Sequence, residues 1–229
     1  MLSERQVEDF HRDGFVTGGQ VVDDAEIGQL RADLAQAIDG AVPDRRQVPV
    51  RCVDLNGNEQ RPVWQTVNMW QASGAFEELS SSATMVAEVA QLTGAEELRT
   101  WHDQIQYKPS EIGGTTDWHQ DGPAWRILEP DVQVTAWVAL DEVDEENGCL
   151  WMVPGSYTWG EVPLGGLSGE LPPTYEGHEV GPVRCGHVHY ASVWRGMRRF
   201  QIEVRGRDGR SGFTTCRRVR ATSLPAITS

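Results

Sequence analysis

The chain has 229 residues, 39% of them hydrophobic, and a formal net charge of −14 at pH 7, which suits one large domain or two small ones with a sizeable core. It contains no apolar run of about 18 residues, and Met1 to Arg5 lacks the basic and apolar regions of a signal peptide, so we expect a cytoplasmic protein with no membrane partner. Its acidic body should also repel nucleic acid.

The charge is unevenly distributed. Residues 195–229 contain nine arginines against Glu203 and Asp208, a net charge of +7, which leaves −21 for residues 1–194. We therefore divide the chain into a main domain, residues 1–194, and an Arg-rich C-terminal segment, residues 195–229.

The N-terminal residues predict a capped helix followed by a short strand. Ser3 is a suitable N-cap, and Gln6 completes a capping box. The helix should run to about Arg12 and end at Asp13-Gly14, before a strand at 15–17.

Two more helices are predicted from apolar residues at helical spacing. One starts at Asp23 or Asp24 and stops at Gly40; the other follows Ser82 and stops at Gly94. We expect the first two helices of the chain to pack on the outside of a sheet. Between the helix that stops at Gly40 and the one that follows Ser82, residues 41–62 should form a long loop with a short strand at 48–53, and residues 64–70 fit either a strand or a short helix.

Beyond Gly94 the pattern changes to strands. Residues 99–108 and 132–140 alternate, each with one mainly apolar face and one face that can line a polar cavity, and 149–153 and 183–193 are further strands. On residues 99–108 the second face carries His102, Gln104, Gln106 and Lys108; on 132–140 it carries Gln133, Thr135, Trp137 and Ala139. Helices followed by many short strands predict an α+β fold, mainly β, with a barrel or jelly roll as its main body.

The stretch His119-Gln120-Asp121 places an imidazole and a carboxylate two residues apart. In a strand both project from one face and can converge on one metal ion. Together with a distant second His they form the 2-His-1-carboxylate arrangement of non-haem Fe(II) oxygenases. His11-Arg12-Asp13 has the same spacing, but in a predicted helix its two side chains diverge by about 200°, so we interpret it as a solvated helix face.

Several motifs in order resemble the phytanoyl-CoA dioxygenase family of Fe(II)/2-oxoglutarate oxygenases. They cover roughly residues 5 to 190. They are Phe10-His11-Arg12-Asp13-Gly14-Phe15-Val16, Trp118-His119-Gln120-Asp121, Val134-Thr135-Ala136-Trp137-Val138-Ala139-Leu140, Glu146-Asn147-Gly148-Cys149-Leu150 and Val153-Pro154-Gly155-Ser156.

The resemblance implies a double-stranded β-helix (jelly roll, cupin-like) with the N-terminal helices outside. It also implies iron bound by His119 and Asp121, and 2-oxoglutarate contacted by Gln104, Trp137 and Arg210. Arg suits this task because its planar guanidinium pairs with a carboxylate through two parallel hydrogen bonds.

The chain departs from the family pattern at the third iron ligand. Where the family has a Trp-His stretch, this chain has Trp194-Arg195-Gly196-Met197, and a guanidinium has no lone pair for a metal. Either His187 or His189 substitutes, or the site lacks its second imidazole. His189 is nearer in sequence to the family position and is our candidate third ligand.

The C-terminal segment, residues 195–229, has few hydrophobic residues, so we expect the closing strands to be incomplete. It is interpreted either as a disordered basic tail or as an aberrant segment, translated outside the ancestral reading frame or truncated.

The predicted function is that of an Fe(II)/2-oxoglutarate-dependent dioxygenase, which uses O2 to hydroxylate an unactivated C–H bond of a small molecule and releases succinate and CO2. One alternative is a catalytically impaired or non-catalytic small-molecule-binding protein on the same fold. A zinc hydrolase is a weaker alternative, because zinc also requires three protein ligands. The substrate and the oligomeric state are left open by the sequence.

Overall fold

The computed structural model describes residues 1–40, 51–57, 60–114, 116–119, 132–141, 143, 149–158, 174–175, 178–179, 181–182, 188–194, 201–203 and 212–222. For Arg51, Trp151, residues 116–119 and 132–133 and everything after 158, the description is of the backbone alone.

The predicted N-terminal helices are present, with their predicted caps. Helix α1 spans Glu4–Asp13 and has the capping box of Ser3, whose backbone N–H donates to Gln6 Oε1 at 2.9 Å. Helix α2 spans Asp24–Ile38 and begins with a second capping box, at Asp23. Helix α4 spans Ala83–Thr93 and ends at Gly94 with a positive φ of 66°.

A further helix, α3, was not predicted. Strand β3 (Trp64–Val67) leads into a 3-10 turn, η1 (Met69–Gln71), so the choice between strand and helix for residues 64–70 is resolved as one followed by the other. Helix α3 (Gly74–Ser80) then follows an N-cap at Ser73. Its seven residues are too few for a recognisable helical pattern.

The described strands form two main sheets. The large sheet has the order β1 (Phe15–Thr17), β11 (Val188–Trp194), β6 (Val132–Ala139), β13 (Gly212–Thr222), β4 (Glu97–Lys108), β3 and β2 (Arg51–Asp54). The small sheet has the order β10 (Gly181–Pro182), β7 (Leu150–Met152), β12 (Gln201–Glu203) and β5 (Thr116–His119). Strands β8 (Thr174–Tyr175) and β9 (His178–Glu179) pair with each other, and a second 3-10 turn, η2, covers Ser156–Thr158.

Two strands lie in the C-terminal segment, where we expected the closing strands to be incomplete. Strand β12 pairs with β5 and β7, and β13 lies between β4 and β6 in the large sheet. For residues 201–203 and 212–222 that expectation was wrong. The rest of residues 195–229 lies outside the described residues, so its interpretation as a disordered or aberrant segment stays a hypothesis.

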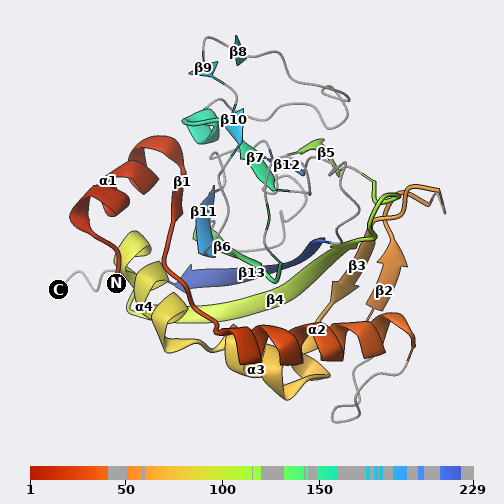
Figure 1. Ribbon diagram of the computed structural model, residues 1–229. Coiled ribbons are helices and arrows are strands. Elements are labelled where there is room, and N and C mark those ends of the chain that lie inside the picture. Colours follow the sequence, from red (N-terminus) through yellow and green to blue (C-terminus); the bar gives the residue numbers. More distant parts are fainter. Residues whose placement is uncertain are drawn as a thin grey trace.

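The molecule is layered, with helices on one face of the large sheet and the small sheet on the other (Figure 1). The main core lies between the helices and the sheet, where Leu34 of α2 and Phe76 of α3 join Ile105 of β4 and Val134 of β6. A second buried cluster forms on the opposite face of the large sheet. It contains Trp137, Val143, Cys149, Leu150 and Met152, with Ala139 and Phe15 packed against it.

Two motifs that are distant in sequence contact each other where α1 ends. Gly14 has a φ of 85°, and a Cβ at this position would lie 2.6 Å from Tyr157 Cδ1. Tyr157 Oη donates to the His11 carbonyl at 2.6 Å, and the Gly155 N–H donates to the Asp13 carbonyl at 2.9 Å. The end of α1 is therefore held against η2.

A buried carboxylate joins α2 to α3. Asp33 is 8% exposed, accepts a 2.7 Å hydrogen bond from Gln29 Nε2 and accepts another from Ser73 Oγ. Ser73 Oγ in turn accepts from the Phe76 N–H at 3.2 Å, which caps α3. One side chain thus organises the start of a helix that the sequence pattern did not reveal.

We expect Asp33→Ala to lower the free energy of unfolding by about 2 kcal/mol, because it leaves a buried hydroxyl without its acceptor. Urea unfolding followed by circular dichroism measures this. Asp33→Asn keeps an oxygen acceptor and should lose less. Equal stability of wild type and Asp33→Ala would show that the contact contributes nothing.

Candidate metal and cosubstrate site

Strand β6 has the two different faces predicted from its alternation. Val134, Ala136 and Val138 belong to the core under the helices, whereas Trp137 and Ala139 belong to the cluster that also contains Met152 of the small sheet. The face that carries Trp137, which we call the inner face, therefore points toward the small sheet.

One row of positions crosses the inner face of the large sheet. Trp137 pairs with His189 on one side and with Cys216 on the other, and Cys216 pairs with Gln104. Thr17 continues the row beyond His189. Positions directly opposite each other in antiparallel strands share a face, so the register brings positions 104, 137 and 189 into one row.

A second row crosses the small sheet. His119 pairs with Gln201, Gln201 pairs with Met152, and Met152 pairs with Gly181. Met152 and Trp137 belong to the same buried cluster, 4% and 2% exposed respectively. The two rows therefore meet through these two side chains, although their residues come from opposite sheets.

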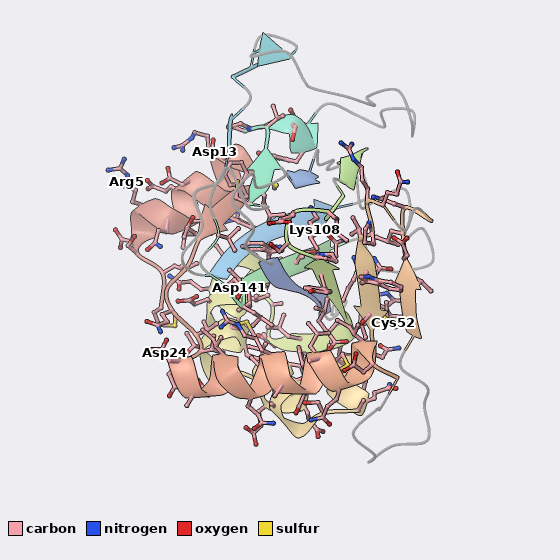
Figure 2. All side chains as sticks on the ribbon, turned by 45° about the vertical axis from the view of Figure 1, so that its right-hand side comes forward. Arg5, Asp13, Asp24, Cys52, Lys108 and Asp141 are labelled. Carbon is pink, nitrogen blue, oxygen red and sulfur yellow. The ribbon has the colours of Figure 1, made fainter. Side chains whose placement is uncertain are left out.

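Strand β4 brings polar side chains to the interior. Lys108 is 8% exposed and lies near the centre of the molecule, whereas Arg5 and Asp24 lie at its periphery (Figure 2). Gln104 and Gln106 are half-buried on the same strand. Strand β4 therefore gives the inner face a polar and charged character at these positions.

His102 belongs to the predicted polar face of residues 99–108, and its side chain is only 6% exposed. Its neighbour Asp103 lies on the other face of β4, toward the helices. There Asp103 Oδ2 accepts a 2.8 Å hydrogen bond from the Trp70 N–H, and the Asp103 carbonyl accepts one from Asn68. Burial raises the pKa of Asp103 to about 6, although backbone hydrogen bonds from residues 68–70 oppose the shift.

The structure describes some of the predicted site residues and not others. His119 ends β5 and His189 lies within β11, both with backbone alone; Gln104 and Trp137 are described in full. Asp121, His187, Arg195 and Arg210 lie outside the described residues. Among the side chains that are described, no three from His, Cys, Asp and Glu come together as a metal site.

The helical copy of the metal motif lies where it was predicted. His11 and Asp13 belong to α1, and His11 and Arg12 are exposed. Arg12 pairs with Asp9 at 2.6 Å, so this His-x-Asp pair is part of a charged helix surface.

Thr135 is an inner-face residue to which we assigned no role. It precedes Trp137 by two positions, it is 2% exposed, and within the described structure its hydroxyl has no hydrogen-bond partner. Its place in the alternating pattern gave its face, but the sequence carried no sign of an unsatisfied hydroxyl.

The donor types present fit Fe(II) and 2-oxoglutarate. Imidazole and carboxylate at positions 119 and 121 are ligands that non-haem Fe(II) uses. The Lys108 ammonium and the Gln104 amide are donor groups of the types that bind a dicarboxylate.

None of the helices in the described ranges combines the length and apolar character needed to cross a membrane.

Solved structures place the fold in a known class, the cupin-like fold of Fe/2-oxoglutarate-dependent oxygenases. The non-haem alpha ketoglutarate dependent epimerase SnoN from nogalamycin biosynthesis superposes with a TM-score of 0.71 at 19% identity, over 99% of this chain and 90% of that one. EvdO2 from Micromonospora carbonacea var. aurantiaca, complexed with 2-oxoglutarate, gives 0.66 at 20% identity, over 100% and 94%.

Sequence comparison identifies the family to which the chain belongs. The model of the phytanoyl-CoA dioxygenase (PhyH) family matches residues 10–170, and the chain belongs to this family. Ectoine dioxygenase of Halomonas elongata is 28% identical over 159 residues, 68% of this chain and 46% of that protein. Peroxisomal phytanoyl-CoA dioxygenase of Bos taurus is 25% identical over 162 residues, 69% and 48%. The chain thus spans about half the length of these curated relatives.

Proposed function

We propose that this protein is an Fe(II)/2-oxoglutarate-dependent dioxygenase that hydroxylates an unactivated C–H bond of a small molecule. In this proposal the two sheets are the halves of a double-stranded β-helix, and the reaction takes place between them. Family membership supports the class of chemistry.

The observation that carries the proposal is the meeting of the two rows. Position 119 lies in the row of Met152, and positions 189 and 104 lie in the row of Trp137. Trp137 and Met152 share one buried cluster. Positions separated by up to about 85 residues in the sequence therefore lie on two rows that meet at this buried cluster.

In this proposal, separate groups of residues would bind Fe(II) and 2-oxoglutarate. His119, Asp121 and a third group, for which we propose His189, would hold Fe(II). Gln104, Trp137 and Arg210 would orient 2-oxoglutarate. When bound, these two groups supply the oxidising chemistry, in which O2 is consumed, 2-oxoglutarate gives succinate and CO2, and one oxygen atom enters the substrate C–H bond. The buried sheet faces would keep water from the reacting atoms.

A second candidate function is a binding protein that keeps the interior but lacks the iron centre. It is favoured by Arg195, which stands where the family has its second His ligand. A guanidinium about 4 Å from Fe(II) would repel each unit of its charge by roughly 4 kcal/mol at an effective dielectric constant of 20.

Formation of succinate from 2-oxoglutarate, with and without Fe(II), tests the proposed function. We expect Fe(II)-dependent and O2-dependent succinate even without the substrate, through uncoupled turnover. If Fe(II) does not bind and no succinate forms under any condition, the binding-protein function is the better description.

Anaerobic Fe(II) titration identifies the third ligand. If His189 is the ligand, wild type binds Fe(II) tightly, His189→Ala binds on the order of 100-fold more weakly, and Arg195→His changes little. If the site lacks a second imidazole, wild type binds weakly and Arg195→His binds more tightly. Tight binding that survives loss of both His187 and His189 would exclude both assignments.

A further inference from the structure

Another row of positions crosses the inner face of the large sheet beside the row of Trp137, and we call it the Thr135 row. Thr135 of β6 pairs with Arg218 of β13, and Arg218 pairs with His102 of β4. Each of these positions is two residues from its counterpart in the first row, so both rows lie on one face. The Thr135 row is nearer the strand ends at Val132 and Thr222, away from Lys108.

Thr135 indicates that this row is built for a polar contact. Its side chain is 98% buried, and its hydroxyl lacks a hydrogen-bond partner within the described structure. A buried hydroxyl without a partner is unfavourable, and each such group in a native protein requires an explanation. A bound ligand atom would satisfy it.

The positive charge of Arg218, the next position in this row, indicates that the ligand is an anion. Arg218 is protonated at any working pH, and neither of its register neighbours, Thr135 and His102, carries a carboxylate. Arg220 follows on the same face, where it pairs with Gln133 and Arg99. Arginine positions therefore recur on this face of a chain whose residues 1–194 carry a net charge of −21.

We propose that the row of Thr135, Arg218 and His102 holds the anionic group, a carboxylate, of the primary substrate. This rests on the proposed function, because it takes the interior between the sheets as the reaction site. The proposed function assigns 2-oxoglutarate to Gln104, Trp137 and Arg210, so this row is a separate one, and Lys108 lies on the other side of the Trp137 row. The anion of the substrate would then approach from the strand ends at Val132 and Thr222, with Thr135 Oγ1 donating to it.

Calorimetric titration of the full chain tests the proposal with a matched pair of probes, hexanoate and its neutral amide hexanamide. It is done anaerobically with Fe(II) and 2-oxoglutarate, and repeated without them. We expect hexanoate to bind at least 10-fold more tightly than hexanamide. Arg218→Gln and Thr135→Val should each reduce that preference at least 5-fold, and Thr135→Ser should keep it.

The matched control is Arg5→Gln, which removes the same charge from a side chain that is 89% exposed on α1. It should leave the preference unchanged. Thr135→Val is nearly isosteric, so it tests the row even if Arg218→Gln does not fold. A purely structural Thr135 would alter the melting temperature of this variant but not its ratio of hexanoate to hexanamide binding.

Two results would overturn the proposal. One is equal binding of hexanoate and hexanamide by wild type. The other is a loss of 2-oxoglutarate affinity in Arg218→Gln, which would assign the row to the cosubstrate. If wild type fails to bind Fe(II) and 2-oxoglutarate, the proposed function fails by itself, and the titration without them still decides whether the row binds a carboxylate.

Discussion

Asp121→Ala should abolish the visible absorbance that the anaerobic complex with Fe(II) and 2-oxoglutarate gives, and should weaken Fe(II) binding on the order of 100-fold or more. The reason is that the change removes the only carboxylate of the proposed ligand set, which otherwise consists of imidazoles. Metal content after gel filtration and circular dichroism of the same sample separate loss of the ion from loss of the fold.

The chain supplies its own control for this experiment. Asp13→Ala removes a carboxylate from the other His-x-Asp sequence, which lies in α1, and should leave the absorbance unchanged. If Asp121→Ala retains the full absorbance of wild type, the pair His119 and Asp121 does not hold the iron.

Asp103→Asn should remove about 3 kcal/mol of pH dependence from the stability of the protein. Burial raises the pKa of Asp103 from its ordinary value of 3.8 to about 6, so the folded state binds this proton more tightly than the unfolded state. The contribution is fully present below about pH 3.8 and is lost as the pH rises through 6. A shift of about two pKa units corresponds to about 3 kcal/mol.

Urea unfolding at several values between pH 4 and pH 8 measures the effect. The free energy of unfolding of wild type should fall relative to that of Asp103→Asn across this range, because asparagine has no proton to lose. Asp24→Asn removes an exposed carboxylate and should follow wild type. Parallel curves for wild type and Asp103→Asn would contradict the prediction.

Local signals predicted much of the helical layer and several strands. The capping box at Ser3, the start at Asp23 and the stop at Gly94 are interactions within a few residues, so a short stretch of sequence specifies them. The alternation in β6 gave the correct face for Trp137 because one side of the strand packs on apolar helices.

The features that were missed depend on partners distant in the sequence. Strand β13 was not predicted because Arg217, Arg218 and Arg220 interrupt the apolar pattern expected of a central strand. Helix α3 depends on the contact between Ser73 and Asp33, 40 residues apart. The depth at which His102 is buried could not be predicted either, because the alternation gives the face of a strand residue but not what packs against that face.

The position of β13 in the large sheet has a consequence for folding. Gly212 pairs with Lys108, and Ala191 pairs with Phe15, so much of the sheet joins segments that are synthesised far apart in time. Contacts of this kind carry a large loop-closure entropy and fold slowly. Strands β4 and β6 are synthesised before β13, the strand that lies between them in the sheet. Until β13 is present, their edges can pair with other chains. We therefore expect the nascent chain to depend on chaperones until β13 has left the ribosome.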